Sequence, residues 1–179
     1  MRVISGKKRG MKLAGFDGDA IRPTTDRVKE NIFNMIAPYV PDARVLDLFA
    51  GTGALAIEAI SRGAAGAVLC ESAAASAKII ELNLAKADFT ELCRLERGDC
   101  FSFLARNVEK FDLVFLDPPY NTGLLKKALD AIVKQDCLAA DGIIVAECDD
   151  PEKPPEVGGL SLKKERKYGR TYILIYTWD

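Results

Sequence analysis

The chain has 179 residues, 49% of them hydrophobic and 28% charged, which is the size and composition of one globular domain with a well-filled core. Its net charge of −1 excludes recruitment of nucleic acid by a bulk positive field, and the lack of histidine argues against a metal centre or Ser-His catalysis. Five scattered cysteines without a C-x-x-C pair, and no apolar run long enough for a signal peptide or a membrane span, predict a reduced, soluble cytoplasmic protein.

The chain opens with a segment that reads as a short hairpin, because two apolar-alternating stretches flank the turn-forming residues 5–10. This segment contains no acid and several cations: Arg2, Lys7, Lys8, Arg9 and Lys12. Such a cluster suits RNA phosphate, although a solvated surface turn explains this patch equally well on its own. We predict an RNA-contacting arm in which Lys7, Lys8 and Arg9 bind phosphate.

A helix is predicted after the arm, because apolar residues recur at helical spacing from Val28 to Ile36, where Pro38 stops the pattern. The segment Arg22-Pro23-Thr24-Thr25-Asp26 supplies the N-cap candidates in front of it. We therefore expect residues 1–41 to form a hairpin and a helix ahead of the main domain, residues 42–179.

Strand and helix patterns then alternate, which predicts an α/β fold with a mainly parallel sheet covered by helices on both faces. The expected strands are Arg44–Phe49, Ala67–Glu71, Cys93–Glu96, Leu113–Asp117 and Gly142–Cys148. The expected helices are Ala54–Arg62, Ala73–Ala87, Cys100–Asn107 and Leu124–Lys134. Two last β-rich stretches, Leu160–Leu162 and Thr171–Trp178, are expected to form an antiparallel pair at the sheet edge.

The first of these strands runs into the glycine turn Ala50-Gly51-Thr52-Gly53, which is typical of a nucleotide-type site. The turn also satisfies the dinucleotide pattern G-x-G-x-x-A, so by itself it does not separate NAD from another adenosine cofactor. Asp47 favours S-adenosylmethionine over NAD, because a carboxylate there repels a pyrophosphate but accepts from a cationic amino group such as that of S-adenosylmethionine.

Two further acids close the next strands. Glu71 lies where a ribose-binding carboxylate is expected, and Asp99 precedes Cys100 and Phe101, so it can accept from an adenine amine. Structural alternatives stand beside each assignment: Asp47 could orient turn amides, Glu71 could be exposed, and Asp99 could cap the helix that begins at Cys100.

Asp117-Pro118-Pro119-Tyr120 follows the fourth strand and joins an acceptor for an amino group to a flat surface for a base. The two prolines fix φ and remove two backbone donors, so the turn is rigid and rich in free carbonyls. This pattern predicts chemistry on an exocyclic amine, and the alternative is a plain turn after a strand.

A second basic patch lies near the end of the chain. Its cations are interleaved with Tyr168 and Tyr172 and are opposed only by Glu165: Lys163, Lys164, Arg166, Lys167 and Arg170. Tyrosines between cations suit phosphate contact together with base stacking, and a solvated surface is the alternative. We expect Lys167 and Arg170, with Arg22, to contribute to RNA binding.

Four segments carry a resemblance to the class I S-adenosylmethionine-dependent methyltransferases, and within them to the RsmD family of 16S ribosomal RNA guanine-N2 methyltransferases. They are Arg22–Glu30, Asp47–Leu55, Ser61–Ala64 and Asp117–Tyr120. The resemblance implies a Rossmann-like seven-stranded sheet with a C-terminal antiparallel strand pair and an N-terminal hairpin arm. It also implies methyl transfer from S-adenosylmethionine to the N2 amine of a 16S guanine, of the guanine(966)-N2 type, on the small subunit.

The resemblance also implies roles for individual residues. Residues of the glycine turn are implied to bind the cofactor: Asp47, Phe49, Ala50, Gly51 and Gly53. Glu71 is implied to bind the ribose, and Asp99 and Cys100 to bind the adenine. The segment with Thr24, Thr25 and Arg27 is implied to close over the methionine end. We expect the Asp117 carboxylate and the Pro118 carbonyl to accept from the target amine, with Pro119 fixing the turn and Tyr120 stacking on the base.

Other interpretations remain open at this point. An adenine-N6 DNA or RNA methyltransferase uses the same acid-Pro-Pro-aromatic arrangement, whereas a glutamine-N5 protein methyltransferase typically carries Asn in place of Asp117. An NAD-dependent oxidoreductase leaves Asp117–Tyr120 unexplained, and a non-catalytic RNA-binding assembly factor needs no cofactor. We expect a monomer that binds 16S rRNA or the small subunit, without metal or membrane.

Overall fold

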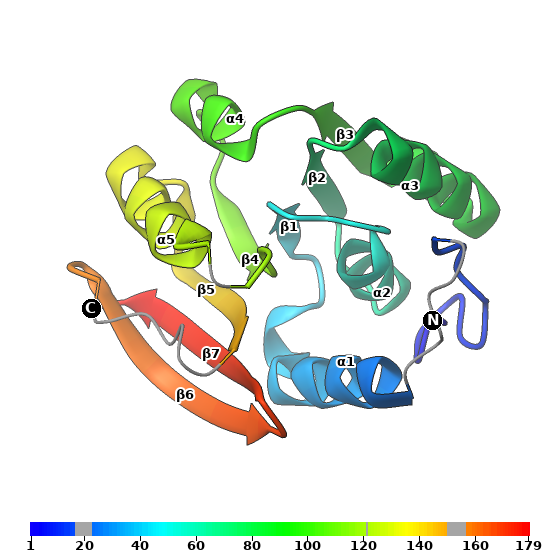
Figure 1. Ribbon diagram of the computed structural model, residues 1–179, viewed down its shortest axis with the longest axis horizontal. Coiled ribbons are helices and arrows are strands. Elements are labelled where there is room, and N and C mark those ends of the chain that lie inside the picture. The colour runs from blue at the N-terminus through cyan, green and yellow to red at the C-terminus, as the bar shows by residue number, and fades with distance from the viewer. Residues whose placement is uncertain (17–22, 121, 150–156) are drawn as a thin grey trace.

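A seven-stranded sheet forms the centre of the computed structural model (Figure 1), which describes residues 1–16, 23–120, 122–149 and 157–179, without the side chains of 23–25. The strands are β1 Arg44–Asp47, β2 Gly66–Glu71, β3 Cys93–Arg97, β4 Phe111–Leu116, β5 Leu138–Asp149, β6 Leu160–Tyr168 and β7 Thr171–Trp178, in the order β3-β2-β1-β4-β5-β7-β6. Strands β1 to β5 are parallel, and β7 pairs antiparallel with both β5 and β6. The Rossmann-like sheet and the C-terminal antiparallel pair are confirmed.

Helices cover both faces of this sheet. They are α1 Pro23–Met35, α2 Ala54–Ser61, α3 Ala74–Ala87, α4 Cys100–Arg106 and α5 Leu124–Gln135, with short 3-10 turns at Ala37–Tyr39 and Thr90–Leu92. One hydrophobic cluster joins the sheet to α1, α2 and α3, and a second joins the opposite face to α4 and α5. Because strand order reverses between β1 and β4, the carboxyl ends of these two strands border the crevice where such sheets bind ligands.

The chain differs from the sequence-based expectations most at three strands. The fifth strand begins at Leu138, where the expectation began at Gly142. The first strand ends at Asp47 rather than Phe49, because the chain leaves the ladder for a turn in which the Ala50 amide donates to the Cys70 carbonyl at 3.0 Å. The sixth strand extends through the cationic segment to Tyr168, where the expectation ended at Leu162. Charged side chains obscure the alternation there, and they suit an edge strand because they oppose pairing with another chain.

The predicted arm is a loop closed by a single antiparallel bridge between Arg2 and Lys12, and it packs against α2. Gly6 makes the closest approach: its φ is +82°, and an added Cβ would lie 1.8 Å from the Ser61 carbonyl oxygen. Val3 of the arm and Phe33 of α1 belong to the same hydrophobic cluster as Val45 of β1. The arm and α1 thus share a core with the sheet.

Glu58 on α2 anchors the arm although its side chain is completely buried. Its carboxylate accepts from the amides of Ile4 at 2.7 Å and Ser5 at 3.0 Å. Arg62 Nε lies 2.7 Å and Lys29 Nζ 3.4 Å from its oxygens. Burial lowers the pKa of Lys29, and the charge of Glu58 opposes that shift. A buried carboxylate with two cations and two amides is satisfied only while the arm is docked.

Among the described residues, none of the helices combines the length and hydropathy that crossing a bilayer requires.

Candidate functional site

Two cavities lie at the carboxyl ends of the parallel strands. The first, about 550 Å³ and here called the α1 cavity, is lined by Lys29 and Ile32 of α1 and by Asp47. The second, about 620 Å³ and called the α4 cavity, is lined by Glu71 and by the start of α4. Both are bordered by the same five residues: Phe49, Gly51, Asp117, Tyr120 and Glu147. The two cavities therefore meet at the carboxyl ends of β1, β4 and β5.

The glycine turn between β1 and α2 forms part of both walls. Gly51 and Gly53 have positive φ values of 56° and 77°, which glycine adopts without steric cost. The Gly51 amide donates to Glu71 Oε2 at 2.9 Å, while Glu71 Oε1 accepts from the Ala73 amide at 2.8 Å. Glu71 is half-buried and lines the α4 cavity. It orients the turn, which is the role considered for Asp47 from the sequence.

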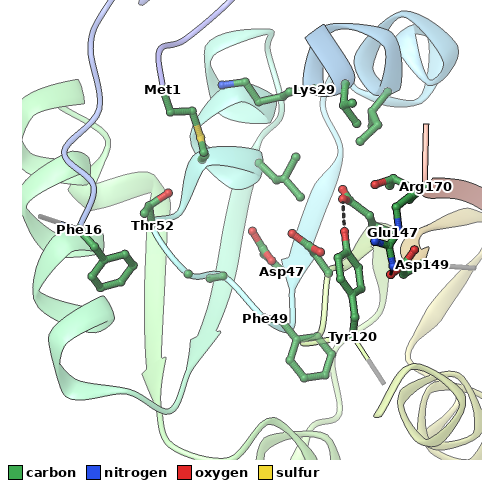
Figure 2. A pocket seen from close by; sticks show the side chains of 18 residues that line it. Met1, Phe16, Lys29, Asp47, Phe49, Thr52, Tyr120, Glu147, Asp149 and Arg170 are labelled. Atoms are coloured by element: carbon green, nitrogen blue, oxygen red, sulfur yellow. Dashed lines mark hydrogen bonds and ion pairs between the residues drawn. The ribbon is translucent and has the colours of Figure 1, made fainter. Parts of the chain in front are cut away.

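Asp47 is an unsatisfied carboxylate beside the α1 cavity (Figure 2). It is 1% exposed, and neither of its oxygens has a hydrogen-bond partner among the described residues. Burial raises the pKa of the Asp47 carboxyl to about 7, and the charge of Glu71 adds to the shift. The nearby amides of Phe49 and Ala56 lower the pKa in part, but neither reaches hydrogen-bonding geometry. The site thus fits a ligand that brings a cationic group.

Asp117 opens onto both cavities, so its carboxylate is solvent-accessible although protein surrounds it on the other sides. Burial, and then the charges of Glu147 and Asp47, raise the pKa of Asp117 well above its usual range. Pro118 is buried, and the Pro119 carbonyl accepts from the Thr122 hydroxyl at 2.7 Å. The turn therefore fixes Asp117 where an approaching amine can donate to it.

Tyr120 lies beside Phe49 at the junction of the cavities and donates its hydroxyl to Glu147 Oε1 at 2.7 Å (Figure 2). Tyr120 is 40% exposed and lines both cavities, so it is accessible to a ligand. Burial and the charge of Glu147 raise the pKa of the Tyr120 hydroxyl, which stays a donor at neutral pH. An aromatic surface held by a hydrogen bond is suited to stacking on a base.

Asp99 performs the capping role considered for it from the sequence. Its Oδ2 accepts from the Ser102 amide at 2.8 Å and hydroxyl at 3.0 Å, and the amide lowers the pKa of Asp99. Asp99 also lines the α4 cavity with Cys100 and Phe101, and Lys127 Nζ lies 3.9 Å from the centre of the Phe101 ring. Burial raises the pKa of the Cys100 thiol to about 11, so the thiol is neutral.

The structure describes only in part the α1 residues that were predicted to bind the cofactor. Thr24 and Thr25 lie in the first turn of α1, but their side chains, like all of Arg22, are outside the described residues. Arg27 is exposed and is not among the described residues that line either cavity. The α1 residues that do line the α1 cavity are Val28, Lys29 and Ile32.

The predicted RNA-binding cations lie in two places. Lys7 and Arg9 are exposed on the arm, and Lys8 Nζ lies 5.7 Å from the centre of the Phe89 ring. Lys167 on β6 donates to the Tyr172 hydroxyl at 2.8 Å, whereas Arg170 lines the α1 cavity, 3.4 Å from Asp149. The arm lies near the N-terminal end of α1, and the turn between β6 and β7 lies near its other end (Figure 1).

Sequence reasoning missed Glu147, Asp149 and Lys29 as lining residues. Glu147 had a usable signal, since it is an acid near the end of a predicted parallel strand, as Asp47 and Glu71 are. Lys29 lies within the Arg22–Glu30 segment that carries the resemblance, but no neighbouring residue signals its burial, which depends on Glu58, far along the chain. Within the part of the chain that the structure describes, no cluster of His, Cys, Asp and Glu side chains is arranged to hold a metal ion.

Comparison with known proteins gives consistent matches over nearly the whole chain. The profile of the family described as conserved hypothetical protein 95 matches residues 1–177. The putative rRNA methyltransferase YlbH of Bacillus subtilis is 42% identical over 180 residues, which cover 98% of each chain. Ribosomal RNA small subunit methyltransferase D of Escherichia coli K12 is 38% identical over 98% of this chain and 89% of its own. The solved structure of the putative methyltransferase yhhF from Escherichia coli superposes with a TM-score of 0.90 at 38% identity, covering 100% of this chain and 98% of that one.

Proposed function

Because the chain belongs to the family of conserved hypothetical protein 95, the RsmD family of methyltransferases, we propose that it methylates the N2 amine of a guanine in small-subunit ribosomal RNA. The enzyme class and the methyl donor, S-adenosylmethionine, follow from the family and the fold. The target base, its amine and the assembled small subunit are the proposal, and the family resemblance points to the guanine(966)-N2 type.

The residues at the two cavities fit this donor. The unpaired, buried oxygens of Asp47 suit its cationic amino group, which supplies the hydrogen bonds that the described protein groups do not. The Glu71 carboxylate has lone pairs left for ribose hydroxyls, and Asp99 with Cys100 and Phe101 offers an acceptor and apolar cover for adenine. When bound, S-adenosylmethionine supplies an electrophilic methyl group on a sulfonium.

One observation carries the proposal: Asp117 and Tyr120 border both cavities. A donor that extends from Asp47 in the α1 cavity to Asp99 in the α4 cavity passes the junction of the two, so a base held against Asp117 and Tyr120 lies beside it. The amine of guanine is a poor nucleophile because its lone pair is delocalised into the ring. Asp117 and the Pro118 carbonyl, by accepting the two amino hydrogens, favour a tetrahedral nitrogen and direct its lone pair toward the space that the donor's methyl group would occupy. Positioning of this kind supplies roughly 7–11 kcal/mol in well-oriented reactions.

Tyr120 would hold the base by stacking. A target guanine must leave its own stack to reach Asp117, and an aromatic ring replaces part of the stacking energy that the base gives up. The hydrogen bond from its hydroxyl to Glu147 limits rotation of the ring. The rigid turn and the fixed ring together orient the amine before reaction.

Cofactor affinity is expected to depend on pH through Asp47. Below about pH 7 the carboxyl is protonated, so it must lose a proton to pair with a cationic amino group. The affinity for S-adenosylmethionine should therefore rise from pH 5 toward pH 7, by at most about tenfold per unit, and level off above. Titration calorimetry of wild type and Asp47→Asn tests this: the variant should bind more weakly with a flatter profile, and an equal slope in both proteins would contradict the assignment.

The arm is expected to bind RNA phosphate. Replacing Lys7, Lys8 and Arg9 by Gln should lower the slope of log affinity against log salt by about 0.7–0.9 for each phosphate that the arm no longer neutralises. The control replaces Lys126 and Lys134 by Gln, and the two slope changes are compared per charge removed; both lysines lie on α5, on the opposite face of the sheet. Filter binding of rRNA over a salt series measures both slopes, and an unaltered slope in the arm variant argues against phosphate binding there.

The substrate class is tested by methyl-labelled S-adenosylmethionine. We expect label in 16S rRNA when the protein and the labelled donor are incubated with small subunits from a strain that lacks this modification, and little label on subunits already modified. Protein-free rRNA, tRNA and DNA are assayed in parallel. Label in DNA or tRNA, with none in 16S rRNA, would overturn the proposed function.

A further inference from the structure

Glu147 is an acid at the site that the proposed chemistry uses only through Tyr120. Strands β4 and β5 are parallel with Leu116 opposite Ala146, so the next residues, Asp117 and Glu147, are neighbours across the sheet. Phe115 and Val145, two residues earlier on each strand, belong to one hydrophobic cluster. Since side chains alternate along a strand, Asp117 and Glu147 face the same side. Both border both cavities.

Asp47 extends this arrangement to a third strand. Val45, two residues before Asp47 on β1, belongs to the same cluster as Phe115, so Asp47 faces the same side of the sheet. Asp47, Asp117 and Glu147 thus form a row of carboxylates across the ends of β1, β4 and β5. Asp47 is buried without a hydrogen-bond partner among the described residues, which indicates that a ligand supplies the hydrogen-bond donors that this row lacks.

The Glu147 carboxylate is held in place but not saturated. Tyr120 donates to Oε1 at 2.7 Å, and a carboxylate accepts further hydrogen bonds through its second oxygen. Burial raises the pKa of Glu147, and the Tyr120 hydroxyl opposes this by favouring the ionised form. Among the described residues, the cations that line the same α1 cavity are Lys29 and Arg170, and Arg170 lies 3.4 Å from Asp149.

Guanine and adenine differ on the edge that such a pair of acids would meet. In guanine the ring N1–H and the N2 amine are adjacent donors, so two neighbouring carboxylates can each accept from one of them. In adenine the amine is flanked by N1 as an acceptor, which an ionised carboxylate repels. A second acid beside the amine-binding acid therefore selects for guanine.

We propose that Glu147 accepts the N1–H of the target guanine while Asp117 accepts from its N2 amine, and that Glu147 thereby sets specificity for guanine over adenine. The assignment rests on the proposed function and adds the group that recognises the base. Asp117 alone distinguishes an amine from other groups, and the pair distinguishes one purine from another. A base that brings donors to both acids also relieves the repulsion between them.

A base analogue tests the contact. 2-Aminopurine keeps the exocyclic 2-amine but has an acceptor at N1 in place of N1–H. It also lacks the 6-oxygen of guanine, so the contribution of N1–H is read from the change in preference between wild type and Glu147→Gln. Small subunits are reconstituted with ligated 16S rRNA that carries guanine or 2-aminopurine at the methylated position. We expect wild type to prefer guanine by roughly 10- to 100-fold in kcat/KM, the range for the loss of one specific hydrogen bond.

Glu147→Gln should remove most of this preference, because a Gln amide donates to the N1 of 2-aminopurine as well as it accepts N1–H from guanine. Tyr120→Phe is the matched control: it deletes the hydrogen bond to Glu147 but keeps the ring, and should keep the preference. If Tyr120→Phe loses the preference while Glu147→Gln keeps it, the preference depends on Tyr120 and not on Glu147, and the proposal is wrong. Thermal unfolding and S-adenosylmethionine binding establish that each variant is folded.

The outcomes separate this inference from the function on which it rests. If wild type forms no N2-methylguanosine on the guanine substrate, the proposed function fails. If it does so but methylates 2-aminopurine equally well, the inference alone fails, and this measurement needs no variant. An equal preference in wild type and Glu147→Gln would likewise reject the contact.

Discussion

Asp117→Ala is expected to lower the rate of methyl transfer by at least about 10²–10³-fold, the cost of removing one preorganised group that stabilises a transition state. The carboxylate would accept from the amine as positive charge develops on its nitrogen, so its loss acts on the chemical step. Affinity for S-adenosylmethionine should change far less, because Asp47 and Glu71 remain in place. Single-turnover kinetics with labelled donor, together with calorimetry, measure the two effects separately.

Two variants control this result. Asp117→Asn keeps the shape and one carbonyl acceptor, so it should retain more activity than Asp117→Ala. Asp112→Ala alters an Asp within β4 that accepts from the Arg44 amide at 2.8 Å and lines neither cavity, and it should leave the rate unchanged. Removing Asp117 also removes like-charge repulsion, so thermal stability should not fall. Normal turnover in Asp117→Ala would exclude the proposed role.

Glu58→Ala is expected to destabilise the protein by about 3–5 kcal/mol, the cost of breaking a buried ion pair by removing one partner. The variant leaves Lys29, only 4% exposed, and the amides of Ile4 and Ser5 without their acceptor. The arm should then detach from α2. Because Met1 and Lys29 line the α1 cavity, cofactor affinity should fall together with stability.

Urea unfolding measures the change, with an exposed ion pair as the matched control. Glu109 Oε1 lies 2.6 Å from Arg94 Nη2, and both side chains are about half exposed. Glu109→Ala should cost no more than about 1 kcal/mol. Glu58→Gln, which keeps the volume and one acceptor, should fall between the two. A cost for Glu58→Ala no larger than that for Glu109→Ala would contradict the anchoring role.

Local patterns in the sequence were sufficient to predict the order of the elements and the position of the turn before α2. The strand before Asp117 and the turn after Asp47 are each determined by a few neighbouring residues, so apolar periodicity and glycine spacing were enough to predict them. The strand through Lys163–Lys167 was not recovered, because an exposed edge strand needs little apolar alternation once β7 pairs with it.

The groups that could not be predicted depend on contacts between distant segments. Glu58 meets Ile4 across 54 positions of sequence, and nothing near either residue signals the pairing. Glu147 meets Tyr120 across 27 positions, because β5 pairs with β4 in a register that sequence patterns do not specify. The sequence also did not indicate that one residue could have two roles. Asp99 caps α4 and lines the α4 cavity, so the capping and the cofactor-binding interpretations of Asp99 are compatible.

Methylation of the N2 amine of guanine is best tested by the identity of the modified nucleoside. Small subunits lacking the modification are treated with the protein and methyl-labelled S-adenosylmethionine, and the 16S rRNA is digested to nucleosides for mass spectrometry. We expect the label to appear as N2-methylguanosine and to disappear with Asp117→Ala. Label recovered as N6-methyladenosine, or in any nucleoside other than guanosine, would contradict the proposed reaction.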